Sequence, residues 1–301
     1  MKVAWSTKVK RSVLAADYDQ AEHGMVQCID EKCRVSVIVN RGNSDIVPHF
    51  KTTGYADSQH KPECGFFQKL DPIEALEKAN EYRTIMASTQ LDEDEYVIDL
   101  NLGRIDPDRT YLSDDENEKK PTKKKEKPEE EEVGEDNKKI TKCTSPKSIV
   151  KLLTKLTPDE LTNIYFSVKR GPKRVKLPLS ELVITPDVAY RYVTENNDTG
   201  EYFVLGRVKH VNRREKVIFI NLYPVNGIDF TLVVFQAHFP YFTYTNEQLV
   251  DKHCVIYGKL RKNQQRESHA EMVIKSNDYI AAFRKRKQVG EQMEPTDRSD
   301  G

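Results

Sequence analysis

Three cysteines and two histidines in one 37-residue window are the residues of this chain best suited to chemistry. Cys28 and Cys33 are separated by four residues and His60 and Cys64 by three, with the strand-like sequence RVSVIVN between the two pairs. Thiolate sulfur and imidazole nitrogen are the donors that Zn²⁺ takes in a closed tetrahedral site. The spacing therefore predicts a structural zinc site formed by Cys28, Cys33, His60 and Cys64.

His49 offers a second histidine for the fourth position of this site. It directly precedes Phe50, whereas His60 lies four residues before Cys64 and in the same knuckle. We therefore expect His60 to be the ligand, with His49 as the alternative ligand or as a residue that hydrogen-bonds to a ligand. The competing interpretation is a window of three buried free thiols and two surface histidines.

Cysteine usage and apolar content predict where the protein resides. The five cysteines are unevenly spaced, residues 1–15 do not resemble a signal peptide, and no apolar run approaches membrane-spanning length. Reduced thiols or a metal are then favoured over a disulfide scaffold. The sequence predicts a soluble, cytoplasmic protein with no membrane partner.

A resemblance to a known family is carried by the segments YDQAEHGMVQCIDEKCRVSVIVN, VPHFKTT and HKPEC, within residues 18–64. They resemble the N-terminal module of CoiA-like competence proteins, in which a cysteine pair precedes strands, an HF segment and a downstream His and Cys. Thr52 stands where that family often has a second histidine, and its nuclease part is not visible. The resemblance implies a bacterial, nucleic-acid-processing setting rather than a reaction. The matching residues are Cys28, Cys33, His49-Phe50, His60 and Cys64.

Acidic residues around a predicted strand at residues 95–102 are the candidates for catalysis. Glu93, Glu95 and Asp99 would suit a metal-dependent nuclease, but no Glu-x-Lys follows at suitable spacing. The chain also has no P-loop, no glycine-rich phosphate cradle and no Ser/His/Asp arrangement. We therefore predict a protein without enzymatic activity and keep a nuclease as the less favoured alternative.

The net charge of zero conceals an uneven distribution. Residues 1–137 contain 20 Lys and Arg against 30 Asp and Glu, whereas residues 138–287 contain 27 against 14. A basic C-terminal half beside an acidic N-terminal half predicts that the C-terminal half binds a polyanion such as nucleic acid.

Five short strands are expected in the C-terminal half, because apolar and polar residues alternate with a period of two. The longest connection falls between the third and fourth strands, where an OB-type Greek-key barrel carries its helix. Gly206 in the first strand and Val255-x-x-Gly258-x-Leu260 in the fourth resemble OB domains of the anticodon-binding and single-strand-binding kind, a fold that hosts many functions. The expected strands are Tyr202–His210, Val217–Tyr223, Phe230–Gln236, His253–Leu260 and Ala270–Lys275.

The predicted barrel core takes Val204, Val208, Ile218, Ile220, Leu222, Ile256 and Leu260. Cations and aromatic residues on the opposite faces form the candidate nucleic-acid surface. Rings stack on bases while cations follow the phosphates, although some rings could instead belong to the core. The surface residues are Arg207, Lys209, Arg213, Arg214, Lys216, Phe219, Asn221, Tyr223, Tyr257, Lys259, Arg261, Lys262 and Arg266. A secondary basic loop for phosphate contacts contains Lys169, Arg170, Lys173 and Arg174.

Four aromatic residues in the long connection support a different function. Phe239, Tyr241, Phe242 and Tyr244 provide more aromatic surface than a short helix needs. Such a surface would suit a protein partner or self-association. The alternative to a binder of single-stranded DNA or RNA is therefore a protein adaptor.

These elements predict a mixed, mainly β architecture. A zinc β-ribbon-like module with a helix starting at Asp71-Pro72 occupies residues 1–112, and a disordered charged linker follows at residues 113–139. A basic helical extension at residues 140–199 leads into an OB-fold barrel at residues 200–287 and a disordered tail at residues 288–301. The acidic part of the linker is either a spacer or a tethered polyanion that competes for the basic surface.

Overall fold

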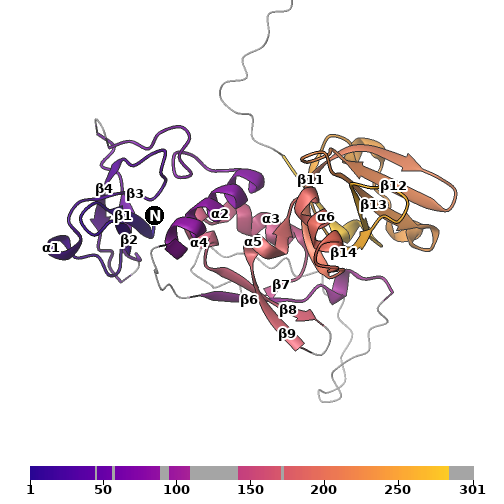
Figure 1. The fold of residues 1–301 in the computed structure, drawn as a ribbon, viewed down its shortest axis with the longest axis horizontal. Coiled ribbons are helices and arrows are strands. Elements are labelled where there is room, and N and C mark those ends of the chain that lie inside the picture. Colours follow the sequence, from indigo (N-terminus) through magenta and orange to yellow (C-terminus); the bar gives the residue numbers. More distant parts are fainter. Residues whose placement is uncertain (45, 56–57, 89–94, 109–141, 171–172, 285–301) are drawn as a thin grey trace, which may run out of the picture.

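The computed structural model describes residues 1–44, 46–55, 58–88, 95–108, 142–170 and 173–284. An N-terminal module, a central group of helices and strands, and a C-terminal barrel follow one another along the long axis of the molecule (Figure 1). The predicted linker at 113–139 and tail at 288–301 lie outside the described residues. Within the described part, no helix is long and apolar enough to cross a membrane.

The N-terminal module is built on an antiparallel sheet with strand order β2-β1-β3-β4-β5. A single-turn helix, α1 (Gln20–His23), is capped by the Asp19 carboxylate, which accepts the N–H groups of Ala21 and Glu22. The strand predicted between the two ligand pairs is β4. The strands are β1 (Val3–Ser6), β2 (Arg11–Leu14), β3 (Val26–Cys28), β4 (Ser36–Asn40) and β5 (His49–Lys51).

Helix α2 (Pro72–Ser88) joins the N-terminal module to the rest of the molecule. It begins as predicted, because the Asp71 carboxylate accepts the N–H groups of Ile73 and Glu74. The N-terminal half of the helix packs in the large core of the central part. Its C-terminal half packs against Val3 and Ile29 of the N-terminal module through Tyr82, Ile85 and Met86.

The central part contains a four-stranded sheet with order β7-β6-β8-β9. β6 runs parallel to β7 and β8, and β9 closes an antiparallel hairpin with β8. The strands are β6 (Tyr96–Leu100), β7 (Lys142–Cys143), β8 (Ile164–Arg170) and β9 (Lys173–Pro178). Nearby helices are η1 (Gly103–Ile105), α3 (Pro146–Lys155), α4 (Pro158–Leu161) and α5 (Leu179–Leu182).

This sheet differs from the predicted division of the chain. β6 was expected in a module of residues 1–112 and β8 in an extension of residues 140–199, yet the two strands are hydrogen-bonded neighbours. Ile98 of β6 is buried and packs in one core with Phe166 of β8. The segments before and after residues 109–141 therefore share one sheet, because a strand obtains its partners from segments distant in sequence.

Five strands of the C-terminal part pair in a closed ring, in the order β11-β12-β13-β15-β14 and back to β11. All these pairs are antiparallel except β13 with β15, which is parallel. The predicted strands are thus present, with boundaries within a few residues of those expected. They are β11 (Glu201–Arg213), β12 (Val217–Leu222), β13 (Asp229–Phe235), β14 (His253–Lys262) and β15 (His269–Val273).

Shorter elements extend and cover the ring. β10 (Val183–Ile184) pairs with β11, and β16 (Ile280–Phe283) pairs with β14. Helix α6 (Pro186–Thr194) contacts four of the ring strands, β11, β13, β14 and β15. The long connection contains η2 (Gln236–Tyr241) and α7 (Asn246–Leu249), as expected for the insert between the third and fourth strands, and η3 (Asn277–Tyr279) precedes β16.

The interior of the ring matches the predicted core. Along β12, Ile218, Ile220 and Leu222 are buried while the residues between them are half-exposed, so period-two alternation sets which face points inward. Gly206 allows β11 to pass close to β12, because a Cβ there would lie 2.6 Å from Leu222 Cδ1 and would displace that side chain. The residues predicted as core are all at most 3% exposed: Val204, Val208, Ile218, Ile220, Leu222, Ile256 and Leu260.

Candidate metal centre and nucleic-acid interface

The four predicted zinc ligands converge in the N-terminal module. Their ligand atoms all lie within 4.8 Å of one another, and the three cysteines are buried. The Cys28 and Cys64 sulfurs are 3.6 Å apart, and His60 Nδ1 lies 3.5 Å from the Cys33 sulfur and 3.4 Å from that of Cys64. A sulfur separation of 3.6 Å is much longer than a disulfide bond, so the cysteines are free.

These separations fit a tetrahedral metal ion. Bonds of about 2.3 Å to sulfur and about 2.0–2.1 Å to nitrogen imply ligand–ligand separations of about 3.3–3.8 Å. Three of the six pairwise separations in the cluster, 3.4, 3.5 and 3.6 Å, fall in that range, and all six are within 4.8 Å. The cluster therefore has the donor types and spacing of a site that could hold a metal.

The thiols differ in their tendency to ionise. The hydrogen bond with Cys64, together with burial, raises the pKa of Cys28, and burial raises the pKa of Cys33. The same hydrogen bond, with help from His60, lowers the pKa of Cys64 to about 5 despite burial. Without a cation the cluster favours one thiolate, whereas a divalent cation stabilises all three in that form.

Two tight turns place the ligands. In the first, β3 ends at Cys28 and the Cys33 N–H donates to the Asp30 carbonyl at 3.0 Å, with Arg34 in a left-handed conformation at φ 45°. In the second, the Cys64 N–H donates to the carbonyl of Lys61 at 3.0 Å. The Phe66 N–H donates to the Cys64 sulfur at 3.4 Å, and this hydrogen bond stabilises a thiolate there.

Asp30 is a residue that the ligand pattern did not predict. Its fully buried carboxylate accepts hydrogen bonds from the Gly65 N–H at 3.2 Å and from Lys78 Nζ and the Tyr82 hydroxyl, both at 2.8 Å. Burial raises the pKa of Asp30, but these hydrogen bonds outweigh it and the pKa lies below its ordinary value. Asp30 thus links both ligand turns to helix α2.

His49 lies outside the ligand cluster. Its Nδ1 is 3.0 Å from the carbonyl oxygen of Val47, and its Nε2 is 3.4 Å from the side-chain nitrogen of Asn40. The group of described residues that converges contains His60 instead. The geometry therefore favours the first of the two histidine assignments.

The outer face of β12 and β13 carries two aromatic rings beside a cation. The cross-strand pairs Phe219–Val233 and Val217–Phe235 make Phe219 and Phe235 diagonal neighbours on one face. Phe235 is 42% exposed, and the Arg214 guanidinium lies 5.5 Å from the centre of the Phe219 ring. Phe235 was not among the predicted surface residues. Thr231 and Val233, which alternate with it on the same face of β13, are buried, so alternation alone did not single it out.

A third aromatic residue, Tyr223, is held by its neighbours. Arg207 lies over the Tyr223 ring at 4.7 Å, and both Arg207 and Tyr223 donate hydrogen bonds to Asp251. Tyr223 remains 37% exposed, so its ring is accessible from one side only.

Tyr257 does not lie on the exposed face where it was predicted. Its side chain is only 6% exposed, its ring lies beside those of Phe203 and Tyr279, and its hydroxyl donates to Glu201 at 2.8 Å. The prediction was wrong because β14 is covered by a neighbouring segment, whereas period-two alternation assumes a solvent-facing side. A buried ring is not available to stack on a base.

The predicted cations and Asn221 fall into two groups. Some already contact other residues. The Arg213 guanidinium donates hydrogen bonds to the Asn246 side chain and the Tyr244 carbonyl, and Arg261 forms an ion pair with Glu271. The Asn221 side-chain nitrogen lies 3.0 Å from His210 Nε2, and its side-chain oxygen accepts a hydrogen bond from the Thr231 hydroxyl. Others are exposed and form no ion pair within the described part of the chain. These are Lys209, Lys216, Lys259, Lys262 and Arg266.

The predicted secondary basic loop is the β8–β9 hairpin, and two of its four cations are already paired. Arg170 donates to Asp198 at 2.9 Å and to the Tyr202 hydroxyl, and Arg174 donates to Asp99 at 2.6 Å. Lys169 and Lys173 are exposed. The loop expected from the Gly-Pro break is therefore shorter than predicted, because strand pairing continues as far as Arg170 and Lys173.

The insert proposed for a protein partner is mostly folded onto the barrel. Phe242 is 3% exposed, and Phe239 and Tyr244 pack against the large core. Only Tyr241, at 52% exposure, presents most of its ring to solvent among these four. The excess of aromatic residues is therefore explained largely by packing over the end of the ring.

No protein-family model and no curated protein matches the sequence. Among solved structures, an aspartyl-tRNA synthetase from Entamoeba histolytica is 15% identical over 28% of this chain and 18% of that chain, with a TM-score of 0.21. The S. pombe Stn1-Ten1 complex is 16% identical over 28% of this chain and 58% of that chain, at 0.21. An asparaginyl-tRNA synthetase from Pyrococcus horikoshii is 16% identical over 35% and 26%, at 0.24. Scores this low carry no argument about function.

Proposed function

We propose that this chain is a non-enzymatic protein that binds single-stranded DNA or RNA on an OB-fold barrel. The closed ring β11-β12-β13-β15-β14, with its insert between β13 and β14, supports the fold. The observation that carries the function is the Phe219–Phe235 pair with Arg214 beside it, on the face of the second and third strands of the ring. Oligonucleotides bind that face and the adjoining loops in OB folds.

In the proposed binding mode, aromatic rings stack on the bases and cations attract the phosphates. Each base that stacks on Phe219 or Phe235 contributes about 1–3 kcal/mol in a manner tolerant of sequence. The exposed cations of the turn after β11 and of the β14–β15 turn attract the phosphates on either side. Those cations are Arg214, Lys216, Lys262 and Arg266.

We further propose that Cys28, Cys33, His60 and Cys64 hold a structural Zn²⁺ ion. Three thiolates and one imidazole within 4.8 Å of one another would fill all four positions of a tetrahedral ion, which suits a structural ion rather than a catalytic one. Such an ion would stabilise the N-terminal module, and the link through Asp30 would fix that module on helix α2.

The test is binding of the full chain to labelled single- and double-stranded DNA and RNA across a salt series. We expect a preference for single strands, with affinity that falls as salt rises. Phe219→Ala and Phe235→Ala should each weaken binding by about 1–3 kcal/mol. Tyr241→Ala, which removes an exposed ring on the insert, is the matched control and should bind like the wild type. Absence of binding at low salt, or equal affinities for all four proteins, would overturn the proposal.

A further inference from the structure

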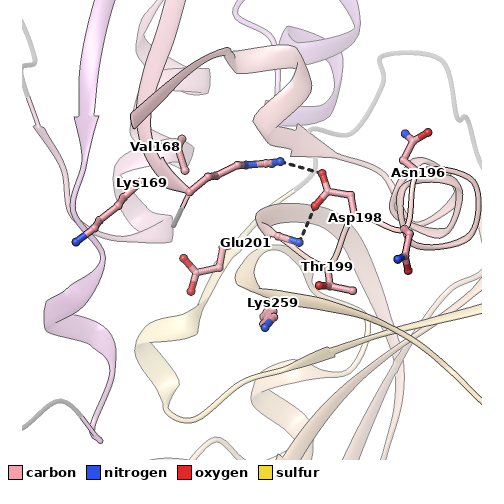
Figure 2. Close-up of a pocket in the computed structure, with 10 residues that line it drawn as sticks. Val168, Lys169, Asn196, Asp198, Thr199, Glu201 and Lys259 are labelled. Carbon is pink, nitrogen blue, oxygen red and sulfur yellow. Dashed lines mark hydrogen bonds and ion pairs between the residues drawn. The ribbon is translucent and has the colours of Figure 1, made fainter. Parts of the chain in front are cut away.

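Charged side chains connect the central part of the molecule to the C-terminal ring. In one such group, Asp198 accepts hydrogen bonds from the Arg170 guanidinium at 2.9 Å and the Gly200 N–H at 2.7 Å (Figure 2). One cation meets one carboxylate there, and a neutral donor completes the group. A second group differs, because a single lysine that follows the last strand pair of β15 meets two carboxylates of the central part.

The two carboxylates belong to the segment that follows β6. Leu102 and Ile105 of this segment are buried in the large core, and the Ile105 carbonyl accepts a hydrogen bond from the Ser276 hydroxyl at 3.2 Å. Asp106 and Asp108 come next along the chain. The segment is thus held on the ring by apolar burial and by a hydrogen bond that involve neither aspartate.

Lys275 is the lysine that both aspartates contact. Its Nζ lies 2.9 and 2.8 Å from the two carboxylate oxygens of Asp106, and 2.9 Å from Oδ2 of Asp108. The hydrogen bond from Lys275 holds the pKa of Asp108 below its ordinary value, so this carboxylate is charged at neutral pH. Two carboxylates against one ammonium leave the group with an excess negative charge, which disfavours an approaching phosphate.

Lys275 follows β15 at the level where Phe235 ends β13. The two strands run parallel with Val233 opposite Val273, and the Ile274 N–H donates to the Val233 carbonyl, which continues the pairing beyond this last pair. Phe235 and Lys275 each lie two residues further along the chain. Since side chains two residues apart on a strand share a face, this register places Lys275 next to Phe235 on the outer face of the ring.

A second contact places the aspartates at the same end of this face. Helix η2 begins directly after Phe235, and His238 lies one 3₁₀ turn after that residue. The Nδ1 of His238 is 3.7 Å from Oδ1 of Asp108. Asp108 is therefore close to both segments that adjoin Phe235, the start of η2 and the end of β15. The Phe235 side chain is 42% exposed at this end.

We propose that Lys275 is a phosphate-binding residue of the aromatic face and that Asp106 and Asp108 occupy it as an autoinhibitory contact. A single strand that stacks on Phe235 carries its phosphates past a cation at this position. The phosphate must displace the two carboxylates from Lys275 and approach their excess negative charge. The full chain therefore binds single strands less tightly than its aromatic face allows. This inference rests on the proposed function of the barrel face, whose affinity it regulates.

Neutralising the two aspartates tests this inference. In the full chain, Asp106→Asn together with Asp108→Asn should tighten binding of a labelled single strand of about 12 nucleotides several-fold. The log–log salt dependence should become steeper by about 0.7, because Lys275 then contacts a phosphate. Asn keeps the shape of the side chain, and Asp108→Asn alone should shift both quantities in the same direction by less. Asp17→Asn together with Glu181→Gln removes two exposed carboxylates elsewhere and is the matched control, which should change neither quantity.

A double-mutant cycle with Lys275→Ala separates release of this lysine from a general change in charge. In the Lys275→Ala background, the two Asn substitutions should leave the steepness of the salt dependence unchanged, and most of the gain in affinity should be lost. If the full gain persists without Lys275, or if the control variant gains as much, Lys275 is not a phosphate contact and the inference is wrong.

The proposed function can stand when this inference fails. If Phe235→Ala weakens binding but the double Asn variant binds like the wild type, the aspartates do not inhibit and the barrel face still binds the strand. If the wild type binds no single strand at low salt, the proposed function fails and this inference fails with it.

Discussion

The N-terminal module and the C-terminal barrel are both small β structures, but their cores differ in composition. Three of the eleven buried residues in the N-terminal core are the cysteines of the cluster. The barrel core consists of aliphatic and aromatic side chains and is continuous with the core of the central sheet. Burial of apolar surface stabilises the barrel, whereas the module core contains a Cys/His cluster that could hold a metal ion.

The two regions should therefore respond to different perturbations. Loss of a metal ion should act on the module, and loss of apolar volume should act on the barrel. Helix α2 contacts the module core with one end and the central core with the other, so it is the path by which one region affects the other. Three perturbations, from the largest expected effect to the smallest, test this division.

Removal of the metal should have the largest effect. Cys33→Ser, or addition of a strong chelator to the wild type, should abolish a binding free energy of about 10–16 kcal/mol for a structural zinc ion. We expect hydrogen exchange of β1 to β5 to accelerate while β11 to β15 remain protected. His49→Ala should retain one equivalent of zinc, because His49 lies outside the cluster. A wild-type protein without zinc, or loss of zinc from the His49 variant, would contradict the assignment.

Removal of a ring from the barrel core should have the next largest effect. Phe230 is 1% exposed, and Phe230→Ala should reduce the free energy of unfolding by about 3–5 kcal/mol through lost burial and a residual cavity. Urea denaturation measures this change, and the zinc content should not alter. Phe235→Ala, on the same strand but 42% exposed, should stay within about 0.5 kcal/mol of the wild type. Equal destabilisation by both substitutions would show that the Phe235 ring is packed against the protein rather than exposed to solvent.

Loss of the Asp30 contacts that link the module to helix α2 should have the smallest of the three effects. Asp30→Asn removes the charge that accepts Lys78 and Tyr82 while keeping the shape of the side chain. We expect zinc affinity to fall about 10–100-fold, as for other residues that orient metal ligands. Competition with a chromogenic chelator measures this change, and Asp17→Asn at an exposed position is the control. Unchanged affinity in the Asp30 variant would mean that the turns hold their geometry without helix α2.

The amino-acid sequence predicted those features that depend on local pattern. The five barrel strands followed from alternation along each strand, and the convergence of Cys28, Cys33, His60 and Cys64 followed from residue type and spacing within two short turns. The preference for His60 over His49 also followed from spacing alone. These predictions succeeded because side-chain alternation and turn geometry are set within a few residues of the chain.

Only the tertiary structure decided which segments meet. It placed β6 beside β8 across residues 109–141, buried Tyr257 between two other rings, and paired Arg170 with Asp198. It also brought Asp106 and Asp108 of the segment after β6 onto Lys275 at the end of β15. Residue type and periodicity specify how a segment folds and which face it buries. The partner that covers that face comes from a distant part of the chain, so its identity emerges only when the whole core is packed.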